Sequence, residues 1–250
     1  MNILIAGQKQ FGADVFRAAR SLPEVQIGAV CSPPGDRLTG QAELYGVKVI
    51  KSGTLNADNM PDGIDLIVAA HSHDFIGERT RLRARFGGIG YHPSLLPVHR
   101  GRDAIRWAIR MNERVTGGTV YRLSNRMDGG NIIDQRHVFI RPDDDARELW
   151  RRELAPLGVA MLTAAVARFA AAGFINGTEQ DETLATWEPS IDRPPAFRPD
   201  LLMIDGPKAR CLAPAPTWGD LWAGHYDDTL QDVIAAERGH HYAAAVNTEE

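Results

Sequence analysis

The chain has 250 residues, of which 44% are hydrophobic and 24% are charged, a composition that can bury the core of a folded domain. A net charge of −4 gives no general attraction to polyphosphate, so a nucleic-acid partner is not expected. The two cysteines, Cys31 and Cys211, lie far apart, and the opening run NILIAG has no basic leader. Both observations predict a reduced, cytoplasmic protein.

Short apolar runs alternate with helical patterns in the first part of the chain. The runs at 2–7, 25–30, 47–50 and 64–70 are predicted strands, and FGADVFRAARSL between the first two has helical spacing. Continuous apolar strands that alternate with helices are typical of a parallel sheet covered on both faces. The predicted fold class is therefore α/β, with a doubly wound, mostly parallel, Rossmann-like sheet.

The second part of the chain predicts further elements in order. These are a helix over 78–86, a short strand at GIGYH (88–92), a helix over 102–112, and paired strands at 117–125 and 131–140 joined by RMDGG. Residues 143–173 predict a long helical region that Pro156 should kink or divide. Its most apolar part is interrupted by Arg168 and is shorter than a bilayer needs, so no membrane partner is expected.

The character of the chain changes near residue 190. DRPPAFRPD is rich in proline, and the remaining residues carry only a weak helical pattern. We expect one domain over 1–190, followed by a proline-rich linker and short carboxy-terminal extension over 191–250. The extension would wrap the core or join two copies of the chain as a homodimer.

Gly7 and Gly12, in GQKQFGAD after the first predicted strand, have the spacing of the two Walker glycines. Ala13 and Asp14 stand where a phosphate loop needs Lys and Ser or Thr, and the dinucleotide pattern is also absent. Two interpretations stay open. The loop, with Gln8, binds a small substrate through backbone N–H groups at a helix start, or its glycines only permit a tight turn.

The stretch GIGYHPSLLPVHRG (88–101) places His92 on a loop that follows a predicted strand. In an open parallel sheet, ligands bind beyond the carboxyl ends of the strands. Pro93 and Pro97 would stiffen this loop, and histidine suits proton transfer or carbonyl polarisation near neutral pH. His92 is therefore a candidate catalytic residue, although a loop histidine taken alone is more often structural or merely exposed.

Asp128 in RMDGG is the second candidate, because the two glycines after it let the backbone approach a ligand closely. The alternative is an ordinary turn aspartate, which is common before Gly-Gly in a hairpin. His71 and His73 in HSH suggest a metal site, but no third ligand stands at a compatible spacing. No metal is therefore expected.

HPSLLPVHRG, followed by AIRWAI, TGGTVY and RMDGGNI, resembles the core signature of the 10-formyltetrahydrofolate-dependent formyltransferase family in order and spacing. The similarity extends to residues 1–190, where ATWEP (185–189) resembles the family's strand after the long helix. The resemblance implies a formyltransferase fold, a catalytic domain over 1–190, and 10-formyltetrahydrofolate as the formyl donor.

The family pairs an Asn-x-His motif with an Asp at the spacing that separates His92 from Asp128, and here Gly90 stands in the place of the Asn. The amide helps to bind the formyl oxygen as negative charge develops, an effect of about 3 kcal/mol in comparable sites. The amino-terminal hydrolase domain of 10-formyltetrahydrofolate dehydrogenase also lacks this Asn and has a Tyr before the His, as Tyr91 is here. The chain resembles that branch most.

The resemblance also implies roles for other residues. His92 would polarise the formyl carbonyl, and Asp128 would act as general base on an amine or on water. The donor would contact the loop after the fourth predicted strand, the proline loop and the RMDGG turn, at His73, Asp74, Phe75, Ile76, Leu96, Pro97, Met127 and Gly129. Substrate would contact Gly7, Gln8, Gly12, Gly90, Tyr91 and Arg100. For His99 and Arg100, a solvated basic rim is an equal alternative to contact with an anionic group.

Two classes of function stay open at this point. The first is an enzyme that removes the formyl group from 10-formyltetrahydrofolate and transfers it to a small-molecule amine or to water. The second is a catalytically impaired folate- or nucleotide-binding module of the same fold, and the presence of both His92 and Asp128 argues against it. A general nucleotide-binding regulator has little support, because the phosphate fingerprints are absent.

Overall fold

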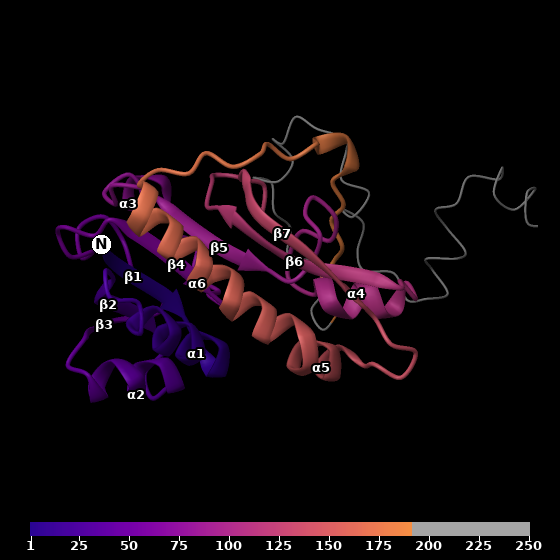
Figure 1. Cartoon of the computed structure of the whole chain (residues 1–250), viewed down its shortest axis with the longest axis horizontal. Helices are drawn as coiled ribbons and strands as arrows, with labels where there is room; N and C mark the ends of the chain where they lie inside the picture. The colour runs from indigo at the N-terminus through magenta and orange to yellow at the C-terminus, as the bar shows by residue number, and fades with distance from the viewer. Residues whose placement is uncertain (192–250) are drawn as a thin grey trace, which may run out of the picture.

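A computed structural model of the chain describes residues 1–191 and places seven strands in one sheet (Figure 1). The sheet order is β3-β2-β1-β4-β5-β6-β7. The strands are β1 (Asn2–Gly7), β2 (Gln26–Ser32), β3 (Lys48–Lys51), β4 (Leu66–Ala70), β5 (Gly88–His92), β6 (Val115–Arg122) and β7 (Ile132–Phe139). The predicted α/β fold with a mostly parallel sheet is confirmed. The expected extension over 191–250 lies outside the described residues except for Ile191.

Strands β3, β2, β1, β4 and β5 pair in parallel, whereas β6 and β7 add antiparallel strands at one edge. The chain builds outward from β1 to β3 and then returns to place β4 on the other side of β1. Beyond the carboxyl ends of β1 and β4, the loops therefore diverge and leave room for a ligand.

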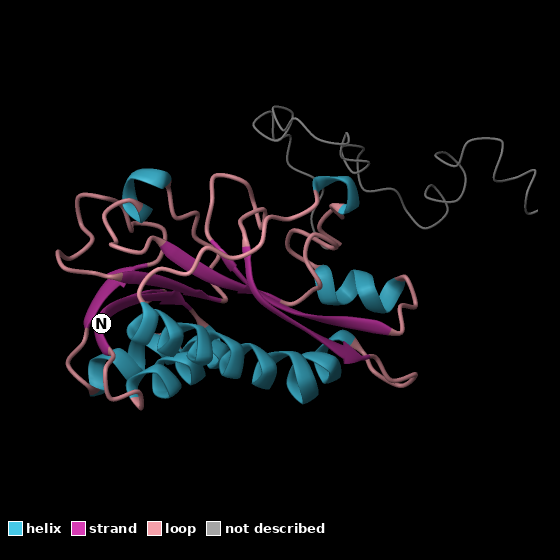
Figure 2. Cartoon of the chain, turned by 45° about the horizontal axis from the view of Figure 1, so that its top comes forward, coloured by secondary structure: helices cyan, strands magenta, loops and turns pink. Residues whose placement is uncertain are grey.

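The two faces of the sheet are covered differently (Figure 2). Alternate residues of β1 point to opposite faces, so Ile3 and Ile5 pack with the long helices while Leu4 and Ala6 join a second apolar cluster. Helices α1 (Lys9–Arg20), α2 (Arg37–Leu44) and α6 (Ala155–Ala172) contribute to the first cluster. Loops and short helical turns cover the second face.

The helix predicted over 78–86 is wrong in length, because α3 covers only Glu78–Arg81. The N–H groups of Arg85 and Phe86 donate to the carbonyl oxygens of Ile64 and Asp65, just before β4. These bonds turn the chain away from the helix and lead it into β5.

Helix α4 (Ala104–Arg110) lies inside its predicted range, and a 3-10 turn, η2 (Glu182–Leu184), precedes the predicted strand 185–189. There, the structure forms only a single bridge, between Arg100 and Trp187.

Pro156 does not divide the long helical region. Helix α5 (Ala146–Leu149) passes into a π-helical turn, η1 (Trp150–Leu154), and then into α6, with the proline in the first turn of α6. The π-helical turn lies just before Pro156, the one residue of this helix that cannot donate a backbone hydrogen bond. The helix Ala146–Ala172 is uninterrupted and lies within the predicted range, but the expectation that its apolar part is too short for a bilayer is wrong. By length and composition this helix could cross one, and 39% of its most apolar window is buried. Core helices of α/β folds share these properties, and its buried face packs on the sheet.

Tyr91 joins this helix to the sheet. Its hydroxyl donates to the carbonyl oxygen of Leu154 at 2.8 Å, and burial raises the pKa of the phenol, which therefore stays a donor. A Cβ atom on Gly118 or Gly158 would lie 2.3 Å or 2.6 Å from the Tyr91 side chain. These two glycines leave the space that the tyrosine occupies.

Gly158→Ala should therefore destabilise the protein by about 1–3 kcal/mol, because the added methyl group overpacks the contact with Tyr91. Gly40→Ala in α2 is the matched control: no atom lies within 4 Å of its Cβ position, and alanine favours a helix by up to about 1 kcal/mol. Urea denaturation measures both changes. Equal effects of the two substitutions would contradict this account of the packing.

Candidate active site

A cavity of about 810 Å³ lies beyond the carboxyl ends of β4 and β5. Its walls come from the loop after β4, the end of β5, the start of α4, the β6–β7 turn and helix α5. The charged and titratable lining residues are His71, His73, Asp74, His92, Arg102, Asp103, Arg106, Arg126, Asp128 and Arg147. The cavity thus combines a cationic rim with the two candidate catalytic side chains.

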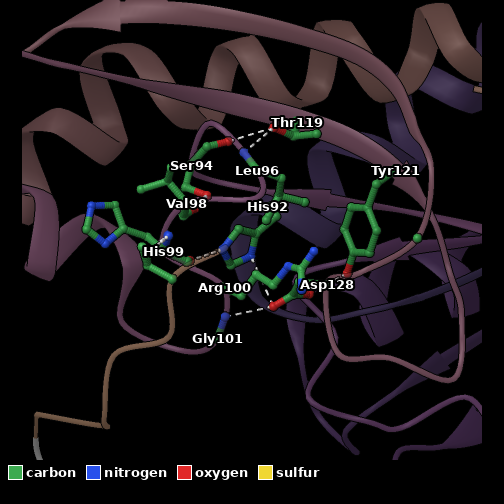
Figure 3. Close-up of polar contacts among 12 residues, drawn as sticks. His92, Ser94, Leu96, Val98, His99, Arg100, Gly101, Thr119, Tyr121 and Asp128 are labelled. Atoms are coloured by element: carbon green, nitrogen blue, oxygen red, sulfur yellow. Dashed lines mark hydrogen bonds and ion pairs between the residues drawn. The ribbon is translucent and has the colours of Figure 1, made fainter. Parts of the chain in front are cut away.

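His92 and Asp128 face each other in this cavity, with Nδ1 of the imidazole 3.6 Å from Oδ2 of the carboxylate (Figure 3). The Nε2 atom of His92 lies 2.7 Å from the carbonyl oxygen of His99. A carbonyl oxygen only accepts hydrogen bonds, so Nε2 carries a hydrogen. The neutral ring therefore presents the Nδ1 lone pair to Asp128, and a second proton makes Nδ1 a donor.

Two donors fix the Asp128 carboxylate. The Tyr121 hydroxyl donates to Oδ1 at 2.6 Å, and the N–H of Gly101 donates to Oδ2 at 2.9 Å. Asp128 has φ of +50°, a left-handed conformation that aspartate adopts more readily than most residues. Its backbone is held by Gln180, whose amide nitrogen donates to the carbonyl oxygens of Asp128 and Gly130, both at 2.7 Å.

Hydrogen bonds to the neighbouring strand fasten the loop that follows His92 (Figure 3). The Thr119 hydroxyl donates to the carbonyl oxygen of Ser94 at 2.7 Å and accepts from the N–H of Leu96 at 3.1 Å. The Leu96–Pro97 peptide bond is cis. His92 and Thr119 are paired across β5 and β6, so the strand and the loop after it are held by the same neighbour.

His99 closes the loop from the other side. Its buried imidazole lies between the carboxylates of Glu113 and Glu188, at 2.8 Å and 3.0 Å. Burial by itself lowers the pKa of His99, but the hydrogen bonds and charges of Glu188 and Glu113 outweigh it and raise the pKa above its ordinary value. Because the His99 carbonyl oxygen accepts from His92, this buried ion cluster also fixes the direction of the His92 ring.

Gly90 lies directly opposite Tyr121 in the β5–β6 register. A Cβ atom on Gly90 would approach Tyr121 Cε1 to 3.3 Å and Leu123 Cδ2 to 3.2 Å, closer than most real contacts. The tyrosine ring therefore takes the space that a side chain at position 90 would enter.

The structure brings only some of the predicted binding residues to the cavity. Those that line it are His73, Asp74, Phe75, Ile76, Met127, Gly90 and Tyr91, together with His92 and Asp128. Those that do not line it are Leu96, Pro97, Gly129, Gly7, Gln8, Gly12 and Arg100. Phe75 is an exposed aromatic side chain, 74% exposed at the cavity mouth.

Four of the residues expected to contact substrate, Gly7, Gly12, Tyr91 and Arg100, make close contacts within the protein itself. A Cβ on Gly7 would meet the Ala70 carbonyl oxygen at 2.3 Å, and one on Gly12 would meet Leu38 at 3.2 Å, so both glycines permit close packing. The Tyr91 hydroxyl bonds to the helix backbone.

Arg100 does not form a solvated rim in this structure. Its guanidinium is buried, and it donates to Gln180 at 2.7 Å and to both carboxylate oxygens of Glu182 at 2.7 Å and 2.8 Å. A charge at this depth needs such pairing. Arg100 therefore fastens the segment that carries Gln180 and, through it, the Asp128 turn.

Sequence reasoning missed four contributors to the site: Tyr121, Gln180, Gly101 and the neutral His71. Burial, followed by the charge of Lys9, lowers the pKa of His71 to about 4, so this ring is uncharged at neutral pH. Its neighbour His73 lies 5.5 Å away between ring centres. Among residues 1–191, no three His, Cys, Asp or Glu side chains gather where they could hold a metal ion. A correct prediction of the β5–β6 pairing would have placed Tyr121 opposite Gly90 and so beside the site.

Comparison with known proteins finds a family that matches part of the chain. The formyl transferase family matches residues 54–166, which include β4, β5, β6, β7 and both His92 and Asp128.

Relatives of the chain include two kinds of enzyme. The cytosolic 10-formyltetrahydrofolate dehydrogenase of Homo sapiens is 32% identical over 75% of this chain, which spans 22% of the dehydrogenase. The methionyl-tRNA formyltransferase of Limosilactobacillus fermentum is 28% identical over 86% of this chain and 73% of that enzyme.

Solved formyl transferase structures share the fold. The phosphoribosylglycinamide formyltransferase of Bacillus halodurans is 22% identical, with a TM-score of 0.59 over 69% of this chain and 96% of that one. The N-formyltransferase of Helicobacter canadensis, solved in complex with folinic acid and dTDP-3-aminofucose, is 20% identical, with a TM-score of 0.61 over 74% of this chain and 69% of that one. At these identities the likeness is one of fold.

The raised pKa of His99 predicts a pH-dependent stability. Its contribution is fully present below the ordinary histidine value of about 6.5 and is lost as pH rises through the folded-state pKa. We expect the free energy of unfolding to fall over this interval, and His99→Gln to remove that fall because glutamine does not titrate. Urea denaturation from pH 6 to pH 9 measures it. The exposed His137→Gln is the control and should keep the fall; an unchanged profile in His99→Gln would contradict the assignment.

Proposed function

We propose that the chain cleaves the formyl group from 10-formyltetrahydrofolate and passes it to a small-molecule amine or to water. The observation that carries this proposal is the His92–Asp128 pair, 3.6 Å apart in a cavity, with both residues inside the segment that matches the formyl transferase family. The relatives support it, because their names include formyltetrahydrofolate dehydrogenases and formyltransferases. Titratable groups at the carboxyl ends of parallel strands are well placed for chemistry on such a substrate.

The arrangement of donors suggests the first step. A nucleophile, water or an amine, attacks the formyl carbon and gives up a proton to Asp128, while the carbonyl oxygen takes the developing negative charge. Protonated Nδ1 of His92 donates to that oxygen, because Nε2 is already committed to the His99 carbonyl. The tetrahedral intermediate then collapses, the bond from the formyl carbon to N10 breaks, and N10 leaves with a proton returned from the Asp128–His92 pair.

The shape and charge of the cavity suit a folate. Ile76, Met127 and Leu123 supply apolar walls for a flat ring, and backbone groups near His92 supply hydrogen-bonding partners. Arg102 and Arg147 are exposed guanidinium groups on the same cavity, where the carboxylates of a glutamate tail would find opposite charge. This cationic rim is local, since the whole chain carries a net charge of −4.

One assay separates the acceptors. The protein is incubated with 10-formyltetrahydrofolate, alone and with candidate amines, while tetrahydrofolate and formate are measured. Hydrolysis yields equal amounts of the two products without an amine, whereas transfer requires the amine and yields no formate. Folate binding without turnover under every condition would overturn the enzyme and leave a folate-binding module.

His92→Gln and Asp128→Asn should each lower kcat by about 10²–10⁴-fold, because each removes a proton-transfer group. Folate binding, measured by calorimetry with 5-formyltetrahydrofolate, should change little. The matched controls are His137→Gln and Asp58→Asn, which alter an exposed histidine and an exposed aspartate away from the cavity. A variant of His92 or Asp128 with full activity would remove that residue from the mechanism.

A further inference from the structure

We propose that Tyr121 is a positioning residue that aims the Asp128 carboxylate, and that position 90 is a glycine because the Tyr121 ring needs its space. This inference rests on the proposed role of Asp128 as general base. It assigns a role to a side chain from β6 whose ring lines the cavity and for which the sequence motifs suggested no function.

The hydrogen bond between Tyr121 and Asp128 has the length of a charge-assisted bond. The phenol oxygen lies 2.6 Å from Oδ1, within the range of O–H donors to an ionised carboxylate. Burial first, and then the Asp128 charge and hydrogen bond, raise the pKa of Tyr121 well above its ordinary value. The hydroxyl therefore keeps its proton across any assay pH and remains a donor.

Strand register brings the tyrosine to this place. Facing residues in an antiparallel pair project to the same side of the sheet, so Gly90, His92, Thr119 and Tyr121 share one face of β5 and β6. With hydrogen in place of a side chain at Gly90, the ring packs against this position of β5 and its hydroxyl reaches the turn that holds Asp128.

The consequence for the carboxylate is a fixed rotation. Tyr121 occupies Oδ1 and the Gly101 N–H occupies Oδ2, so the oxygen nearest His92 cannot exchange places with the other. Without the phenol, one anchor remains and the carboxylate can turn about its side-chain bond. A general base must stay within hydrogen-bond reach of the proton it takes, so this freedom should slow the chemical step.

The first test is Tyr121→Phe, which deletes the hydroxyl and keeps the ring. We expect kcat to fall about 10-fold or more, with unchanged binding of 5-formyltetrahydrofolate. The loss should fall on kcat rather than on KM, because the deleted hydroxyl bonds to Asp128 and leaves the rest of the cavity in place. Wild-type kcat would overturn the proposal.

Tyr91→Phe is the matched control. It deletes the hydroxyl of the other buried tyrosine of this sheet, whose partner is the Leu154 carbonyl oxygen. Both substitutions should lower the midpoint of thermal unfolding, but Tyr121→Phe should lower kcat by much more than Tyr91→Phe does. An equal loss of kcat in both variants would indicate a general structural effect and would contradict a role through Asp128.

The second test does not depend on activity. A buried phenol bonded to a carboxylate should give a slowly exchanging, downfield hydroxyl proton in the NMR spectrum, assigned by its loss in Tyr121→Phe. Asp128→Asn should move this resonance upfield, because an amide is a weaker acceptor than a carboxylate. If the wild-type protein releases no formyl group while this shift appears, the proposed function fails and the pairing stands. If the resonance does not respond to Asp128→Asn, the pairing itself fails.

The third test is a double-mutant cycle. Gly90→Ala should lower kcat by pushing the ring away from Asp128, since its methyl group would lie 3.3 Å from Tyr121 Cε1. In the Tyr121→Phe background the same substitution should cost much less, because the hydroxyl is already gone. Additive effects of the two substitutions would contradict the claim that position 90 acts through Tyr121.

Discussion

The hydrogen bond from His92 Nε2 to the His99 carbonyl oxygen decides what the site can do. It fixes the ring in one tautomer, so that only Nδ1 is free to exchange protons and Nδ1 faces Asp128. The carbonyl belongs to a loop that is tied to β6 through Thr119 and to Glu113 and Glu188 through the His99 imidazole. These contacts hold the irregular loop in position, as the sheet holds the strand before it.

The Asp128 side of the pair depends on longer-range contacts. A non-glycine residue with φ of +50° needs surrounding contacts to hold it, and here Gln180 bonds to the carbonyl oxygens on the turn while Arg100 bonds to Gln180. Arg100 belongs to the loop after His92, whereas its partners Gln180 and Glu182 follow the long helix α6. The two halves of the site are therefore joined by a segment that contributes no atom to the reaction.

The apolar runs were sufficient to predict the parallel strands, because short continuous apolar runs between helical patterns are typical of strands buried on both faces. His92 and Asp128 could be proposed from their motifs and the position of strand ends. The length of α3 could not be predicted, because backbone bonds from Arg85 and Phe86 to residues before β4 end that helix early. The burial of Arg100 and the position of Tyr121 depend on strand register and on a distant segment, and neither is visible in a local pattern.

The most direct measurement of the central claim is a crystal structure of the protein with 5-formyltetrahydrofolate, a stable formylated folate. We predict the pterin ring in the cavity beyond β4 and β5, with the formyl group within hydrogen-bond reach of His92 Nδ1 and beside Asp128. A folate bound elsewhere, or bound in this cavity with its formyl group directed away from both side chains, would contradict the proposed chemistry.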